Sequence, residues 1–156
     1  MNSFARAQYA DRLLSQGKHS EAWSELQKIP AEDDEIVQVL KVRVQTLWAL
    51  GKCELAADLA RKLVAVCPDE TIHWTWLGVL TRKVFGIEAA ARIYEEAVER
   101  YPATGIFRYS LASRYCALGR FDEAREHMAL GLVSDPSWRE VALDDPALEM
   151  IWDVVT

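Results

Sequence analysis

The 156-residue sequence has few of the residues that interrupt helices or cross-link a chain. It contains only seven glycines and five prolines, so long helices with few breaks are expected. Its three cysteines, Cys53, Cys67 and Cys116, are odd in number, and no two of them lie at metal-ligand spacing. A disulfide framework is therefore not expected, and a reducing, cytoplasmic compartment is the simplest interpretation.

Long apolar runs are also missing. No stretch approaches the roughly 20 apolar residues of a membrane-spanning helix, and charges at Arg6, Asp11 and Arg12 argue against a signal peptide. The formal net charge of −6 repels the phosphates of nucleic acids and anionic lipids. Neither nucleic acid nor membrane is therefore expected as a partner.

Groups that perform chemistry are sparse. The three histidines, His19, His73 and His127, do not converge once helices are assigned, so neither a metal site nor a catalytic triad follows. Each is interpreted as a surface or half-buried side chain. The acidic run 32–35 is interpreted as a solvated loop, and Cys67 lies near a helix C-terminus, where the helix dipole disfavours a thiolate. No glycine-rich phosphate loop is present, so no enzyme activity and no cofactor are expected.

An internal repeat of 34 residues is the strongest positive signal. A glycine, a short turn and an alanine-containing helix start recur at Gly17, Gly51 and Gly119, which are separated by one and two periods. A degenerate copy with a displaced glycine falls between the last two. Two other residue types keep the same period, namely the alanines Ala22, Ala56, Ala90 and Ala124 and the prolines Pro68, Pro102 and Pro136. Proline cannot continue a helix, so each proline closes the second helix of a unit.

The third unit shows the helices most clearly. Its first helix is predicted over 70–84, with Trp74, Leu77, Gly78 and Thr81 on one face. Its second is predicted over 87–100. Alanine or glycine at the middle of the first helix (Ala10, Gly78, Ala112) and at the start of the second lets neighbouring helices approach closely.

These residues resemble the tetratricopeptide repeat family. The resemblance rests on Trp74, Leu77, Gly78, Ala90, Tyr94, Ala97 and Pro102, and on Leu111, Ala112, Tyr115, Gly119, Ala124 and Pro136. It implies an all-α, α-α superhelix, a right-handed solenoid of antiparallel helix pairs. The expected organisation is a single domain, 1–156, with repeats at about 3–34, 37–70, 71–104 and 105–138.

The two ends depart from the pattern. Pro30 comes early, so the second helix of the first unit is predicted to be short, at about 21–28. In the C-terminal segment, 137–156, Ser137 and Glu140 fit a capping box, and Asp145 before Pro146 fits a helix N-cap. A capping helix over 147–155 is expected to pack on the last repeat.

The resemblance also implies that the first helix of each unit lines a concave groove. The partner-binding candidates on these helices are Lys41, Gln45, Trp48, Ile72, Thr75, Val79, Arg82, Lys83, Tyr109 and Ser113, together with Ala7, Asp11, Leu14 and Cys116. They combine rigid aromatics with cations, so the hypothesis is a protein or peptide segment with an apolar residue and at least one acidic group. The alternative is that Trp48 packs on a neighbouring helix and the cations are ordinary surface charges.

Some members of the family clamp the C-terminal carboxylate of a partner with Lys, Asn and Arg on successive first helices. Lys41 matches that clamp and Gln45 is a loose stand-in, but Trp76, Ile106 and Ser110 occupy the remaining places. These side chains cannot donate the network, so such binding is not predicted.

Three functional classes follow from the sequence. The first is a non-catalytic protein–protein interaction scaffold. The second is a homo-oligomeric structural or assembly protein, for example a homodimer. Its motivation is the six tryptophans, which exceed the needs of one core and can form exposed, tryptophan-rich interfaces. The third, an enzyme, rests on no identified residue.

Overall fold

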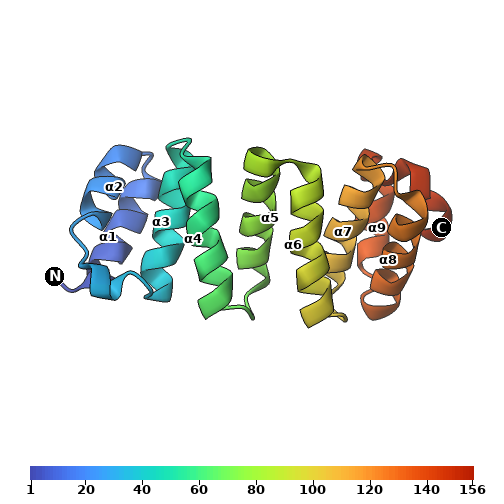
Figure 1. The fold of residues 1–156 in the computed structure, drawn as a ribbon, viewed down its shortest axis with the longest axis horizontal. Coiled ribbons are helices and arrows are strands. Elements are labelled where there is room, and N and C mark those ends of the chain that lie inside the picture. Colours follow the sequence, from blue (N-terminus) through green and yellow to red (C-terminus); the bar gives the residue numbers. More distant parts are fainter. The chain divides into compact units, whose positions relative to one another are not determined.

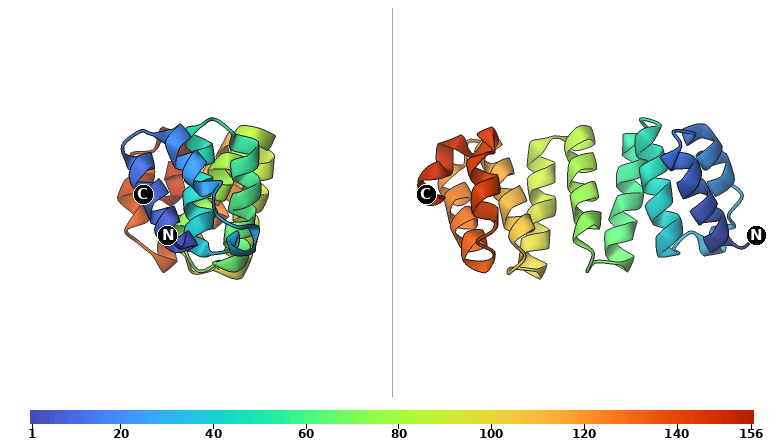
Figure 2. Two further views of the ribbon diagram at one scale, coloured as in Figure 1. Left: turned by 90° about the vertical axis from the view of Figure 1, so that its left-hand side faces the viewer. Right: turned by 180° about the vertical axis from the view of Figure 1, so that it is seen from behind.

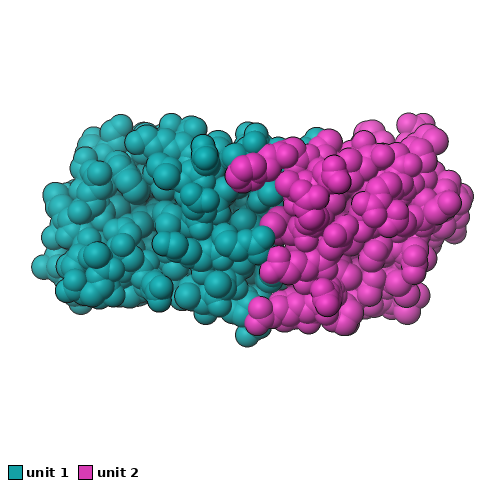
Figure 3. Space-filling view, viewed as in Figure 1, with its two compact units in different colours: residues 1–84 teal, residues 85–156 magenta.

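The computed structural model describes all 156 residues, and all of its elements are helices (Figure 1). The all-α class is therefore confirmed. The chain divides into two compact units, residues 1–84 and 85–156, which Figure 3 colours separately. Folding of residues 1–156 as one domain stays a prediction. No helix is both long and apolar enough to span a membrane.

The first unit contains two antiparallel helix pairs and one further long helix. Its elements are α1 (Ser3–Ser15), α2 (His19–Leu26), the short 3-10 helix η1 (Ala31–Asp33), α3 (Val37–Ala49), α4 (Cys53–Val66) and α5 (Thr71–Phe85), whose last residue is counted in the second unit. Helix α3 is in contact with α1, α2 and α4, as the views in Figure 2 also show. Helix α2, the second helix of the first repeat, has only 8 residues and is therefore short, as predicted.

The second unit is built around one helix. Its elements are α6 (Ile87–Arg100), α7 (Gly105–Ala117), α8 (Phe121–Ser134), α9 (Trp138–Leu143) and the 3-10 helix η2 (Pro146–Val154). Helix α7 is in contact with all four of the others. The C-terminal elements therefore pack on the last helix pair, as expected.

Glycines end three of the first helices in the same way. Gly17, Gly51 and Gly119 have φ angles of 75°, 74° and 74°, which are strained for residues with a Cβ atom. After Gly17, the Lys18 amide donates to the Leu13 carbonyl at 2.9 Å, and the same bond recurs after the other two glycines. This is the Schellman motif, which ties off the free carbonyls at a helix C-terminus. The repeated glycine thus has a specific conformational cause.

The displaced glycine and the prolines also have structural roles. Gly86, with φ 93° and ψ 179°, precedes the first residue of α6 rather than following a Schellman turn. Pro68, Pro102 and Pro136 each lie two residues beyond the end of a second helix, at α4, α6 and α8. The proline prediction is confirmed.

Small residues fill the positions predicted for close helix approach. The alanines of the repeat are fully buried, with 0% exposure at Ala10, Ala22, Ala56, Ala90, Ala112 and Ala124. Ala10 and Ala22 join one core cluster with Leu13, Leu26 and Val42, from α1, α2 and α3. Larger side chains at these points would force the helices apart.

The C-terminal segment follows one prediction and departs from another. Asp145 caps η2 as predicted, because its carboxylate accepts from the Ala147 amide at 2.9 Å. The element is a 3-10 helix rather than an α-helix, and it is broken at Ile151, where φ is −126°. Leu148, Ile151 and Val155 are nevertheless completely buried, so the segment covers the apolar side of the last pair.

The predicted capping box at Ser137 is wrong. The Ser137 hydroxyl donates to the Asp135 carboxylate at 2.5 Å instead of capping α9. The backbone amide of Ser137 donates to the same oxygen at 3.1 Å. These bonds lower the pKa of Asp135 and close a tight turn before α9.

Candidate partner-binding surface

Three predicted site residues form one stripe on α3. Each residue of an α-helix turns the chain by about 100°, which places Lys41, Gln45 and Trp48 within an arc of roughly 60°. All three side chains are half-buried. We call this set the α3 stripe.

The other sides of α3 explain why the α3 stripe stays accessible. Val39 and Val42 are fully buried in the cluster formed with α1 and α2. On a second side, Leu40, Val44 and Leu47 are at most 1% exposed, and α3 packs against α4. The α3 stripe is the part of the helix that neither contact uses.

Helix α5 carries a second set of predicted residues. They fall within an arc of roughly 100° on α5, and they are Ile72, Thr75, Val79, Arg82 and Lys83. Ile72, Arg82 and Lys83 are exposed and the other two are half-buried. Trp74 and Leu77, on the opposite side of the helix, are at most 2% exposed. The α5 set thus combines apolar side chains with two accessible cations.

Helix α1 offers less than the sequence predicts. Ala7 is wrong as a groove residue, because it is completely buried in the core cluster of the first unit. Leu14 packs against the same cluster and is only partly accessible. Asp11 alone remains as a half-exposed polar candidate on this helix. The prediction for Ala7 failed because α2 and α3 both pack on the side of α1 that carries Ala7.

On α7, the chain itself engages the predicted aromatic residue. The hydroxyl of Tyr109 donates a hydrogen bond to the carboxylate of Asp145, and the ring of Trp138 lies 4.9 Å from the Tyr109 ring. Burial and this hydrogen bond raise the pKa of Tyr109. Ser113 is half-buried and Cys116 is 9% exposed. The sequence did not indicate that the C-terminal segment reaches Tyr109.

A close approach fixes the indole of Trp138. A Cβ atom added to Gly105 would lie 2.8 Å from the Cδ1 atom of Trp138 and 3.0 Å from the Cβ atom of Asp135. Real Cβ atoms do not approach other atoms so closely, so only glycine fits at the start of α7 with the indole in this place. The Trp138 side chain and the α7 backbone are therefore closely packed.

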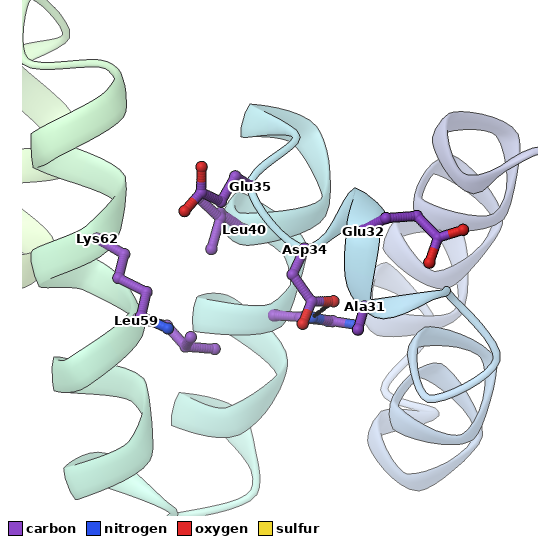
Figure 4. A pocket seen from close by; sticks show the side chains of 8 residues that line it. Ala31, Glu32, Asp34, Glu35, Leu40, Leu59 and Lys62 are labelled. Atoms are coloured by element: carbon purple, nitrogen blue, oxygen red, sulfur yellow. Dashed lines mark hydrogen bonds and ion pairs between the residues drawn. The ribbon is translucent and has the colours of Figure 1, made fainter.

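A pocket beside η1 was not predicted (Figure 4). It is lined by Ala31, Glu32, Asp34, Glu35, Leu40, Arg43, Leu59 and Lys62. Glu32 and Glu35 are exposed, as expected of a solvated loop, but the two residues between them also contact the helices. Asp33 accepts from the Ser3 hydroxyl at 2.5 Å, and Asp34 forms an ion pair with Arg43 at 2.5 Å. The signal in the sequence was the unusually long connection between two helices.

The histidines lie on separate helices. His73 is completely buried, with Nδ1 3.1 Å from the Cys67 carbonyl, so its interpretation as a surface or half-buried side chain is wrong. His19, on α2, and His127, on α8, are half-buried. No group of three or more His, Cys, Asp or Glu side chains is arranged to hold a metal ion.

Comparison with protein families identifies the repeat. Residues 86–137 match the tetratricopeptide repeat model. This stretch of the chain carries the tetratricopeptide repeat pattern. Comparison with curated protein sequences gives no match.

Solved structures extend the likeness to nearly the whole chain. MamA from Desulfovibrio magneticus RS-1, from residue 41 to its end, has a TM-score of 0.68 and 20% identity, covering 97% of this chain and 92% of that one. Another MamA crystal structure reaches 0.74 at 16% identity, covering 97% and 81%. YrrB, described as a tetratricopeptide repeat protein with an unusual peptide-binding site, scores 0.66 at 16% identity, covering 96% and 82%. These likenesses confirm the tetratricopeptide fold.

Within this array of helices, the candidate surfaces have distinct origins. The α3 stripe lies on a first helix, at positions that the packing of the repeat does not use. The pocket beside η1 and the contact between Asp145 and Tyr109 come instead from the connection 27–36 and the C-terminal segment. The repeat pattern therefore predicted the first surface and neither of the others.

Proposed function

We propose that the protein is a non-catalytic protein–protein interaction scaffold that binds a partner segment through the α3 stripe and the α5 set. The observation that carries this proposal is the accessibility of the α3 stripe after both adjoining sides of α3 are buried. An aromatic ring, an amide and a cation along one helix are chemically suited to binding a segment rather than to packing. YrrB, which has a similar fold and is described as having a peptide-binding site, supports the proposal that this fold binds a peptide segment.

The chemistry of these side chains defines the partner. Trp48 supplies a rigid apolar surface, and tryptophan and arginine are enriched at the centres of protein interfaces. Lys41 on α3, with Arg82 and Lys83 on α5, supplies positive charge in a protein of net charge −6. We therefore propose a partner segment with an apolar residue and at least one acidic residue, held by a charge-assisted contact.

Charge reversal tests the surface directly. Peptides selected from a displayed random library on the wild-type protein are expected to combine apolar and acidic residues. The double variant Lys41→Glu with Arg82→Glu is expected to abolish their binding, as measured by fluorescence anisotropy. Its circular dichroism melt should stay nearly unchanged, because Lys41 is half-exposed and Arg82 is exposed.

A matched control makes the same change of net charge elsewhere. Lys18 precedes α2 and Arg92 lies on α6, and both side chains are exposed. The variant Lys18→Glu with Arg92→Glu should retain binding of the selected peptides. Equal loss in both double variants would mean that only net charge matters, and unfolding of the first would mean that these helix faces are wrongly assigned.

The homo-oligomeric alternative depended on exposed tryptophans. Trp74 is 1% exposed, and the other five tryptophans are half-buried. Trp138 packs on Gly105 and Tyr109, and the Trp152 indole donates to the Ala142 carbonyl at 2.8 Å. Much of the tryptophan surface is thus used within the chain, which favours the scaffold. A dimer that survives dilution in light scattering would favour the alternative.

A further inference from the structure

One half-buried arginine of the second unit lacks the partner that the others have. Five arginine side chains are half-buried, and four of them donate to a carboxylate or a backbone carbonyl at 2.5–3.2 Å, namely Arg6, Arg43, Arg108 and Arg125. Arg114, on α7, donates to neither, and its Nε atom is buried without an acceptor. A guanidinium that is partly removed from water without an oxygen acceptor loses hydrogen bonds that nothing in the chain replaces.

The packing of the repeat does not account for a charge at this place. One and two periods before Arg114 lie Leu80 on α5 and Thr46 on α3, and both are 0% exposed. The Thr46 hydroxyl donates to the Val42 carbonyl of its own helix at 2.7 Å. Three periods before lies Arg12, which is exposed on α1. Arg114 is therefore a cation at a position that the two preceding repeats fill with a buried side chain without charge.

The ring of Tyr94 holds the guanidinium in place. The guanidinium carbon of Arg114 lies 5.0 Å from the centre of this ring, which belongs to a side chain only 1% exposed and hydrogen-bonded to Ser110. Burial raises the pKa of Tyr94 and of Tyr109, and the charge of Arg114 opposes this at both, so the guanidinium lies near both hydroxyls. A cation already fixed on a buried ring loses little freedom when it binds a ligand.

The charges around the guanidinium define what it can bind. Its two Nη groups match the two oxygens of a carboxylate. The nearby carboxylate of Asp145 does not pair with Arg114, because it accepts from the Tyr109 hydroxyl and from the Ala147 amide. One cation beside an occupied carboxylate favours a ligand with a single negative charge over a phosphate with two.

We propose that Arg114 binds the side-chain carboxylate of an aspartate or glutamate of a partner protein. The Nη groups donate to both carboxylate oxygens, while the Tyr94 ring supports the guanidinium from below. Arg114 lies outside the α3 stripe, the α5 set and the places of the carboxylate clamp. The site goes beyond the proposed function and does not depend on it, so the two can fail separately.

A single carboxylate in a small probe tests the site. The probe is N-acetyl-aspartate amide, which has no terminal charges, titrated into the isotope-labelled protein and followed by NMR. We expect a saturable shift of the Arg114 Nε–H signal, and no such shift with the neutral N-acetyl-asparagine amide. Arg114→Gln should weaken binding severalfold, as measured from the backbone amides of α7. Arg114→Lys should weaken it less, because it keeps the charge and loses the paired donors.

Two control variants locate the binding. Arg92→Gln removes one positive charge from the exposed surface of α6 and should leave binding of the probe unchanged. Lys41→Glu with Arg82→Glu, which alters the proposed partner surface, should also leave it unchanged. Loss of binding in either control equal to that in Arg114→Gln overturns the proposal, as do equal shifts with the aspartate and asparagine probes. Tighter binding of N-acetyl-phosphoserine amide than of the aspartate probe would overturn the choice of a carboxylate.

Discussion

Helices α3 and α7 hold equivalent places in the second and fourth repeats but differ in what covers them. On α3 the stripe of Lys41, Gln45 and Trp48 remains partly accessible. On α7 the hydroxyl of Tyr109 is bonded to Asp145 of the C-terminal segment. The same helix position is thus open in the first unit and used by the chain itself in the second.

The difference shows what kind of segment such a helix face accepts. The C-terminal segment presents a carboxylate, Asp145, followed by the buried apolar side chains of Leu148 and Ile151. An acidic group beside apolar residues is also the chemistry proposed for a partner of the α3 stripe. The C-terminal segment therefore provides a reference against which an external partner can be compared.

The largest expected effect concerns the burial of the C-terminal segment. Leu148 is completely buried, so Leu148→Ala should destabilise the fold by about 2–5 kcal/mol through lost burial and an unfilled cavity. Urea denaturation followed by circular dichroism measures this change. Met150→Ala is the matched control, because Met150 on the same segment is 59% exposed and its loss should cost less than about 0.5 kcal/mol.

The same denaturation experiment tests whether the two compact units unfold together. If residues 1–156 form one domain, Leu148→Ala shifts a single transition for all probes. Two separated transitions, with only one shifted, would show that the units unfold independently. The comparison between α3 and α7 would then be one between two domains.

The next effect isolates the packing of Trp138 on α7. Gly105→Ala should destabilise the protein by about 1–3 kcal/mol, because the new methyl group cannot fit beside the Trp138 indole. The gain in helix propensity from alanine opposes this only partly. A double-mutant cycle with Trp138→Ala provides the measurement: the cost of Gly105→Ala should largely disappear once the indole is gone. Additive effects would place the strain elsewhere.

Features built by the repeat could be predicted from the sequence, and features outside the repeat could not. The repeat dictated the helix pairs, because alanines at fixed spacing and glycines in a left-handed turn each permit only one local arrangement. It also located the α3 stripe, since the period assigns two sides of α3 to neighbours. The period places Ala7 at the position of Lys41, but residues of α2 and α3 bury Ala7 in the core cluster.

The features that break the repeat could not be derived from it. The Ser137 hydroxyl was expected to cap a helix, but it donates its hydrogen bond to the nearby Asp135 carboxylate instead. The contact of Asp145 with Tyr109 joins residues 36 apart in the chain. The tight turn before α9 and the break at Ile151 have no sequence period either.

A smaller effect tests whether Asp145 helps to hold the C-terminal segment on α7. Tyr109→Phe removes the hydroxyl while keeping the ring beside Trp138, so it should cost about 1 kcal/mol. Hydrogen exchange should increase at the start of η2 more than in α3. Tyr9→Phe, on α1, is the control because Tyr9 is 37% exposed. No change in either measurement would mean that apolar burial alone holds the segment.

The smallest expected effect is a pH dependence confined to the second unit. His127 on α8 lies with Nδ1 3.1 Å from Nη1 of Arg108 on α7, and its ring contacts that of Tyr115 at 5.6 Å. Burial, and then the nearby Arg108, lower the pKa of His127 below 6.5, against the weaker opposing influence of Glu126, Glu123 and Glu95.

Below pH 6.5 the unfolded chain therefore binds a proton at His127 more readily than the folded protein does. The stability contributed by the neutral imidazole is full above that pH and is lost as the pH falls toward the lowered pKa. His127→Gln keeps a group that can accept from Arg108 but does not titrate, so the decline in urea midpoint between pH 7.5 and 5.5 should be shallower than in the wild type. His19→Gln, in the first unit, should leave the wild-type decline unchanged. A steeper decline in His127→Gln would reverse the assigned sign, and an equal flattening by His19→Gln would remove the distinction between the two units.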